Sequence, residues 1–261
     1  MTHTIALLAD IHFGCEDKQA IDAFAAALPA INPDVVVVAG DLTYRGKRAE
    51  FETAERWLAT LKRPIVIAPG NHDVPHYNIF QRFIAPFALY DSHMHEDGMQ
   101  VFNDETVAIV TMNTARGVQA RLNWAHGVIS REQADDAARE LRKAPADSAR
   151  LVCCHHPLVV PQGAPIKTST KGGPEAGAVL AAAGIDVVMT GHLHRPFAEP
   201  LPFGDRKTWS VGAGTMSERQ RGDPPGFTTL SRTPGAMRMV IWDAGEAVAK
   251  PRQAISLELR H

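Results

Sequence analysis

The sequence has few cysteines, no long apolar run and almost no net charge. Its three cysteines are an odd number and make no disulfide framework, which favours a reducing, cytoplasmic setting. No apolar run reaches the roughly 18 residues at which a membrane-spanning helix is expected, and the first residues lack the basic region of a signal peptide. A formal net charge of -2 argues against a surface for polyanions. We therefore expect neither a membrane span nor stable nucleic-acid binding.

Length and composition instead suit one α/β domain. The 261 residues, 45% of them hydrophobic, are enough to bury a sizeable core. No internal repeat, low-complexity tract or linker divides the chain. We therefore expect a single domain over residues 1–261, with room for a modest cap.

Apolar runs alternate with helical patterns in the N-terminal part of the chain. Residues 35–39 are an unbroken β-branched run, typical of a buried parallel strand. Similar runs cover residues 4–9 and 65–68, while residues 17–28 and 51–61 carry apolar side chains at helical spacing. This alternation predicts right-handed βαβ units.

The rest of the chain carries further strand and helix patterns. Strands are predicted at 102–113, 151–154 and 187–190, and helices at 130–142 and 176–183. Four later runs are expected to form a second, largely antiparallel sheet: 207–211, 227–230, 237–242 and 255–259.

The segment 75–98 is unusually rich in aromatic and histidine side chains. Phe80, Phe83 and Phe87 fall on one face if the segment is helical. We expect a helix that packs on the core or on a second copy of the chain, or that forms a small cap.

Side chains that can bind metal follow five of the predicted strands. They are Asp10, His12, Asp41, Asn71, His72, His155, His156, His192 and His194. The carboxyl ends of strands in an open α/β sheet form its ligand crevice. Taken singly, Asp41 can be a helix cap or turn residue, Asn71 can form an Asx turn, and either of His155 and His156 can be a packed core residue. Their occurrence together favours a site.

The donor set indicates two metal ions. Carboxylate, imidazole and amide groups without thiolate suit Mn, Fe or Zn. The donors are too many for one tetrahedral ion and about the right number for two. A pair of ions about 3.5–4 Å apart needs a bridging group, and the Asp41 carboxylate is the candidate.

These segments resemble the five signature motifs of the calcineurin-like metallophosphoesterases. The motifs are Asp10-Ile-His12, Gly40-Asp41, Gly70-Asn71-His72-Asp73, His155 before His156-Pro157, and Gly191-His192-Leu-His194. All five occur in the family's order. The resemblance implies a four-layer α/β/β/α sandwich of two mixed sheets flanked by helices. In detail, including the later segment 214–222, the chain is similar to the bacterial cyclic-nucleotide and glycerophosphodiester phosphodiesterases.

The resemblance also implies a role for each motif residue. One ion would be bound by Asp10, His12, Asp41 and His194, and the second by Asp41, Asn71, His155 and His192. His72 would face the phosphate or the leaving oxygen, and Asp73 would orient His72. His156 is interpreted as structural.

The expected reaction is hydrolysis of a small phosphodiester, for example a 3′,5′-cyclic nucleotide. A hydroxide bridging the two ions would attack phosphorus in line, while the ions and His72 neutralise charge on the oxygens. One alternative is a phosphomonoesterase or protein phosphatase on the same site. Another is a non-catalytic scaffold, because fold does not imply function. Candidate substrate contacts, which can equally be solvated loop residues, are His76, Tyr77, Lys167 and Lys171.

Overall fold

Alternate side chains of the central strands enter two different hydrophobic cores. In β2 (Val35–Ala39), Val35 and Val37 belong to a core shared with the second sheet, whereas Val36 and Val38 belong to a core shared with helices. A strand buried on both faces explains the unbroken apolar runs in the sequence. The computed structural model describes residues 3–94, 98–121 and 123–260.

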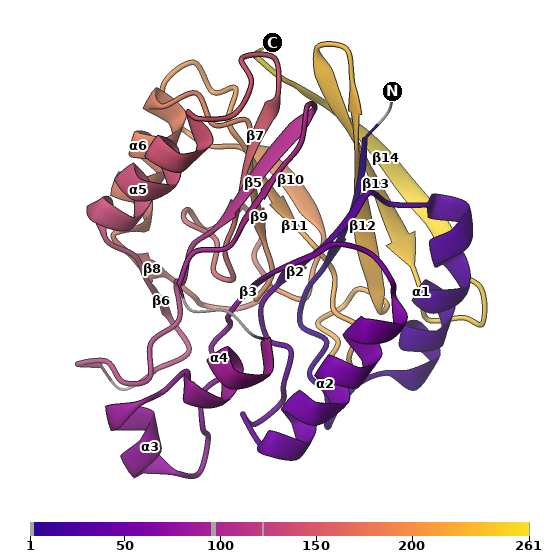
Figure 1. The fold of residues 1–261 in the computed structure, drawn as a ribbon, viewed down its shortest axis with the longest axis vertical. Helices are drawn as coiled ribbons and strands as arrows, with labels where there is room; N and C mark the ends of the chain where they lie inside the picture. The colour runs from indigo at the N-terminus through magenta and orange to yellow at the C-terminus, as the bar shows by residue number, and fades with distance from the viewer. Residues whose placement is uncertain (1–2, 95–97, 122, 261) are drawn as a thin grey trace.

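Two mixed sheets pack face to face (Figure 1). The first has the order β14-β13-β12-β1-β2-β3 and the second β10-β11-β9-β7-β5-β4, and β6 and β8 form a separate small ladder. The remaining bounds in the first sheet are β1 (Thr4–Leu8), β3 (Ile65–Ala68), β12 (Gly226–Thr233), β13 (Ala236–Asp243) and β14 (Lys250–Glu258). Those of the other strands are β4 (Val101–Asn103), β5 (Val107–Thr111), β6 (Gly127–Val128), β7 (Ala149–Cys153), β8 (Thr170–Lys171), β9 (Val187–Thr190), β10 (Phe197–Pro200) and β11 (Trp209–Gly212).

Helices cover the outer face of each sheet. The pair α1 (Lys18–Ile31) and α2 (Arg48–Thr60) packs on the first sheet through buried Phe24 and Phe51, among others. The pair α5 (Arg131–Leu141) and α6 (Gly173–Ala182) packs on the second. The four-layer α/β/β/α arrangement expected from the family resemblance is thereby confirmed (Figure 1). Among the described residues, no helix combines the length and apolar character that a membrane crossing needs.

The C-terminal strands do not form a sheet of their own, contrary to expectation. β12 pairs antiparallel with β1, with Thr4 opposite Ser231, and so extends the first sheet. β11 instead joins the second sheet, parallel to β9. Hydrophobic patterning marks these segments as strands, but it does not specify which strand edge each one pairs with.

The prediction for segment 75–98 is wrong in part. Two short helices, α3 (Ile79–Ile84) and α4 (Ala88–Met94), replace one helix. Pro86 explains the break, because a proline disfavours helical backbone at the preceding residue. Phe80 and Phe83 are 74% and 59% exposed rather than packed on the core, and Phe87 packs against the core between the first sheet and its helices. Residues 95–97 of the segment lie outside the described residues.

The strand expected at 102–113 is interrupted. Asp104 accepts backbone hydrogen bonds from Thr106 and Val107, which creates a turn between β4 and β5. The two strands pair antiparallel across that turn. The other expected helices and core strands are present, with bounds that differ by a few residues.

Candidate active site

The seven predicted metal ligands meet at the strand ends of both sheets. The first sheet contributes the residues that follow β1, β2 and β3, and the second those that follow β7 and β9. All seven side chains are at most 8% exposed: Asp10, His12, Asp41, Asn71, His155, His192 and His194. Donor atoms in several subsets lie within 4.8 Å of one another. The structure therefore brings together the residues that the sequence motifs single out.

One group of donors surrounds Asp10. His194 Nε2 lies 3.1 Å from Asp10 Oδ1 and 3.3 Å from His12 Nε2. His12 Nε2 is also 3.8 Å from Asp41 Oδ2. These distances are those of ligands arranged around a common point.

A second group shares Asp41. His155 Nε2 lies 3.3 Å from Asp41 Oδ2 and 3.2 Å from Asn71 Oδ1. The ring of His192 is 5.2 Å from that of His155, centroid to centroid. The Nε2 atom of His192 contacts the Thr168 hydroxyl at 2.9 Å, which leaves Nδ1 as the nitrogen with which it can bind an ion.

Backbone carbonyls set the tautomer of three of these histidines. The Nδ1 atoms of His12, His155 and His194 lie 3.2, 2.8 and 2.5 Å from the carbonyl oxygens of Thr43, Ala39 and Arg219. A carbonyl oxygen only accepts, so each Nδ1 carries a proton. When the ring is neutral, its Nε2 lone pair is the one that faces the centre. This is the arrangement by which proteins orient histidine ligands.

The electrostatics of the site also fit cations. Asp10 Oδ1 is buried without a hydrogen-bond partner among the described residues, while Oδ2 accepts from the His192 backbone N–H at 2.8 Å. The Arg219 carbonyl oxygen accepts from His194 Nδ1, so a neutral His194 ring would present the lone pair of Nε2 to Oδ1. A buried, unpaired carboxylate oxygen is costly unless a ligand satisfies it. A divalent cation held by these donors would do so.

Burial and the carboxylates shift the pKa values of the imidazoles in opposite directions. Burial lowers the pKa of His12 to about 3 and outweighs Asp41, so this ring is neutral near pH 7. Burial also opposes charge on His155, but the adjacent Asp41 carboxylate raises the pKa of His155 to about 9. A cation bound at His155 has to displace that proton.

Five ligand positions have left-handed backbone. The φ angles are 52°, 53° and 54° at Asp10, His12 and Asp41, and 67° and 54° at His192 and His194. Non-glycine residues seldom adopt this conformation, and it tends to occur at functional sites. At these five positions, which follow β1, β2 and β9, the chain turns sharply as it leaves the strand.

Close packing around the carboxylates requires glycine at two motif positions. A Cβ atom on Gly70 would lie 2.1 Å from Asp41 Oδ1, and one on Gly191 would lie 2.7 Å from Asp10 Oδ2. No side chain fits at either distance. The glycines are there because the carboxylates need the space.

His72 faces the site, but its partner is not the expected one. Its Nδ1 lies 2.6 Å from the Tyr44 carbonyl oxygen, which orients the ring. Asp73 instead accepts hydrogen bonds from the backbone N–H groups of Thr43 and Gly70, each at 2.9 Å. Burial, with the nearby Asp41, raises the pKa of Asp73 to about 7. The expectation that Asp73 orients His72 is corrected: Asp73 braces the loops that carry Asp41 and Asn71.

The two ring nitrogens of His156 both have protein partners. Nδ1 contacts the Thr114 hydroxyl and Nε2 the Ala125 carbonyl oxygen, each at 2.9 Å. With both nitrogens engaged, His156 has none left for a metal ion. Its donor atom nevertheless lies within 4.8 Å of those of His155 and His192, so the structural role of His156 stays a prediction, which the two contacts favour.

A pocket of about 240 Å³ opens onto the donors. Its lining includes Asp41, Asn71, His72, Lys167 and His192, all singled out from the sequence. The lining does not include His76, Tyr77 or Lys171. It also contains residues that the sequence analysis did not name as substrate contacts, among them Asn123, His126, Thr168, Arg219 and Arg221.

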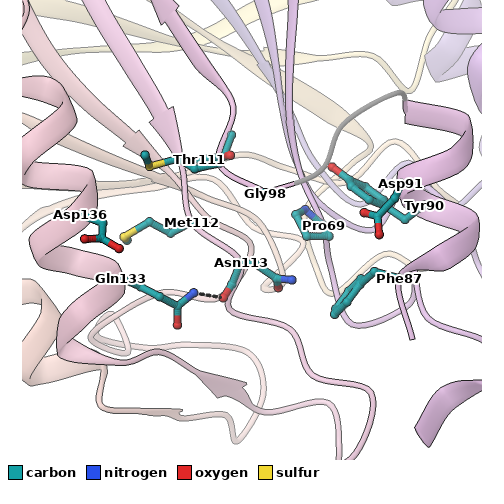
Figure 2. A pocket seen from close by; sticks show the side chains of 11 residues that line it. Pro69, Phe87, Tyr90, Asp91, Gly98, Thr111, Met112, Asn113, Gln133 and Asp136 are labelled. Carbon is teal, nitrogen blue, oxygen red and sulfur yellow. Dashed lines mark hydrogen bonds between the residues drawn. The ribbon is translucent and has the colours of Figure 1, made fainter. Parts of the chain in front are cut away.

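A larger pocket of about 380 Å³ lies between α4 and α5 (Figure 2). It is lined by Pro69, Tyr90, Met112 and Asn113, among others, and Gln133 donates a hydrogen bond to the Asn113 carbonyl oxygen at 2.9 Å. None of the seven donors lines it. The smaller pocket is therefore the one that belongs to the chemistry.

Comparisons with known proteins agree with this geometry. Residues 3–196 match the family model for calcineurin-like phosphoesterases. The chain is 28% identical over 212 residues to a probable cyclic nucleotide phosphodiesterase of Rhodopseudomonas palustris, covering 76% of this chain and 74% of that one. It is 27% identical to the 3′,5′-cyclic adenosine monophosphate phosphodiesterase CpdA of Escherichia coli K12, covering 73% and 69%.

Solved structures show the same fold at low identity. A dimetal phosphatase from Danio rerio superposes with a TM-score of 0.70 at 12% identity, covering 98% of this chain and 99% of that one. The family match spans all five motifs. The chain therefore belongs to the calcineurin-like phosphoesterase family, an enzyme class whose chemistry is phosphoester hydrolysis.

Proposed function

We propose that this chain is a dinuclear metal-dependent phosphodiesterase that hydrolyses small phosphodiesters, with 3′,5′-cyclic nucleotides as the first candidate substrates. The observation that carries the proposal is the shared position of Asp41 Oδ2, which lies 3.8 Å from His12 Nε2 and 3.3 Å from His155 Nε2. One carboxylate oxygen thus serves both donor groups. The activities named for the R. palustris and E. coli relatives support the substrate class.

The donors divide into two ligand sets. Asp10, His12, Asp41 and His194 would hold one divalent ion, and Asp41, Asn71, His155 and His192 the other. Such ions lower the pKa of water to near neutrality and neutralise charge on phosphoryl oxygens. Mn, Fe and Zn all suit this donor set.

The chain's own groups orient the substrate. The Tyr44 carbonyl oxygen accepts from Nδ1 of His72 and fixes the ring, so Nε2, which faces the pocket, carries a proton only in the protonated ring. In that form His72 can donate to a phosphoryl or leaving oxygen. Asp73 maintains the two loops on either side of the Asp41 carboxylate. We therefore assign His72 a catalytic role and Asp73 a positioning role.

Phosphomonoester hydrolysis is the second candidate. Three cationic side chains line the pocket, Lys167, Arg219 and Arg221, and positive charge favours a dianionic monoester over a monoanionic diester. A non-catalytic scaffold has less support. Such a protein would have no need of a buried carboxylate oxygen without a hydrogen-bond partner, as Asp10 Oδ1 is among the described residues.

The test is turnover of a matched pair of chromogenic esters. The protein is stripped of metal, reloaded with manganese and assayed on bis(4-nitrophenyl) phosphate and 4-nitrophenyl phosphate. The proposal expects faster diester turnover, and cyclic nucleotides are then assayed. Faster monoester turnover would identify a phosphatase. Absence of turnover together with absence of retained metal would identify a scaffold.

A further inference from the structure

The loop between β11 and β12 brings an arginine to the candidate metal site. Arg219 Nη1 lies 3.1 Å from His72 Nε2 and 3.2 Å from His12 Nε2. This loop follows residue 196, where the match to the family model ends. The guanidinium is therefore a part of the site that the five motifs do not contain.

Hydrogen bonds hold the loop against the end of β1. The Thr215 hydroxyl donates to the Asp10 carbonyl oxygen at 2.8 Å, and the Glu218 N–H donates to the Cys15 carbonyl oxygen at 3.1 Å. The Arg219 N–H donates to the Ser217 hydroxyl at 3.3 Å. The position of Arg219 is thus tied to the strand that carries Asp10 and His12.

The surroundings of the guanidinium suit an anion. Arg219 is half-buried in the pocket lining, with Cζ 5.5 Å from the centroid of the Tyr44 ring. Its described side-chain contacts are two imidazole nitrogens and this ring, with no ion pair to a carboxylate among the described residues. A guanidinium offers several N–H donors in a planar fork that matches phosphate oxygens.

We propose that Arg219 is a substrate-binding residue that donates a hydrogen bond to a non-bridging phosphoryl oxygen beside His72. The inference rests on the proposed function, because it takes the phosphoryl group to occupy the pocket between the donors and this loop. With a substrate there, the anionic oxygen replaces the imidazole nitrogens as the acceptor for the guanidinium.

The backbone of Arg219 has a separate role from its side chain. Its carbonyl oxygen accepts from His194 Nδ1 at 2.5 Å and so orients a predicted metal ligand. A side-chain substitution keeps this carbonyl. Arg219→Ala is therefore expected to remove the phosphate contact while metal content stays unchanged.

Arg45 provides a matched control. Its Cζ lies 4.8 Å from the centroid of the same Tyr44 ring, but its guanidinium donates to the Tyr77 hydroxyl and does not line the pocket. Arg45→Ala removes an equal charge from the same ring without altering the site. Arg219→Lys keeps the charge but loses the planar fork.

The experiment measures inorganic phosphate binding to the manganese-loaded protein by calorimetry, with metal content determined by mass spectrometry. Arg219→Ala is expected to weaken phosphate binding by about 10-fold to 100-fold, Arg219→Lys by less, and Arg45→Ala hardly at all. Equal phosphate affinity in wild type and Arg219→Ala would overturn the proposal. Loss of metal in Arg219→Ala would also overturn it, by showing that the side chain supports the ligands instead.

Turnover separates this inference from the proposed function. If the wild type hydrolyses neither chromogenic ester, the proposed function fails, while phosphate calorimetry still tests Arg219. If the wild type turns over the diester, Arg219→Ala is expected to reduce kcat/KM by about 100-fold. An unchanged kcat/KM in that variant would overturn the role of Arg219 alone.

Discussion

His155 Nε2 lies 3.3 Å from Asp41 Oδ2, and the two residues belong to different sheets. His155 follows β7 of the second sheet, and Asp41 follows β2 of the first. An ion bound by both would join the ends of the two sheets. Metal binding and folding stability should therefore be linked.

Metal removal is expected to lower the thermal stability of the protein. A ligand that binds only the folded state stabilises it by about 2.7 kcal/mol at 100 times its Kd. Differential scanning calorimetry of the manganese-loaded and the chelator-treated protein measures the difference. An unchanged Tm would show that the ions do not bind between the sheets. Protein loaded with magnesium instead of manganese provides the comparison.

Asn71→Ala and His72→Ala should separate metal binding from chemistry at adjacent positions. Asn71→Ala removes a ligand from the second set, so metal content should fall and turnover should drop by orders of magnitude in a folded protein. His72→Ala should keep both ions and lose about 10²–10⁴-fold in rate, the usual contribution of a positioned acid or base. Mass spectrometry and turnover assays distinguish the two. Loss of metal in His72→Ala would contradict the assignment.

The Asp104 carboxylate should make the free energy of unfolding depend on pH in acid solution. Burial opposes its ionisation, but hydrogen bonds from Val107 and Thr106 and the neighbouring His3 hold its pKa below the ordinary 3.8. A lowered folded-state pKa gives stability that is fully present above pH 3.8 and is lost as pH falls through the folded-state value. Urea unfolding between pH 2 and pH 7 should show the wild type's advantage over Asp104→Asn shrinking below about pH 4. A constant advantage would contradict this origin.

Substitutions at Phe80 and Phe24 should differ greatly in their effect on the free energy of unfolding. Phe80→Ser is expected to change the free energy of unfolding by no more than about 0.5 kcal/mol, because the ring is largely exposed. Phe24→Ala should cost about 3–5 kcal/mol, because that ring is fully buried between α1 and the first sheet. Urea unfolding measures both. Sedimentation of Phe80→Ser also tests whether α3 contacts a second copy, which would appear as a lower mass than that of the wild type.

The convergence of the seven donors could be predicted because its signals are local. Each donor follows an apolar run within a few residues, so Asp41 or His155 can be placed at a strand end without knowing which strands are neighbours. The convergence of the strand ends then follows from the general behaviour of α/β sheets. The family resemblance assigned each donor to an ion.

Contacts between residues far apart in the sequence could not be predicted in the same way. The hydrogen bond between the Thr215 hydroxyl and the Asp10 carbonyl oxygen joins residues 205 positions apart, and no local sequence pattern predicts it. The role of Arg219 depends on that bond, so the likeness of segment 214–222 to the phosphodiesterases does not by itself identify Arg219 as a site residue. The attachment of β12 to β1 was missed for the same reason.

The left-handed backbone at five ligand positions bears on how sequence variation should be interpreted. Aspartate, asparagine and histidine are the non-glycine residues found most often in this conformation, and they are also the chemical types that bind these ions. A library randomised at Asp10, His12, Asp41, His192 and His194 and selected only for a folded product should therefore enrich aspartate, asparagine, histidine and glycine. Retention of these residues in such a selection is not by itself a sign of catalysis. Only enrichment of aspartate over glycine or asparagine under selection for turnover would report on the chemistry.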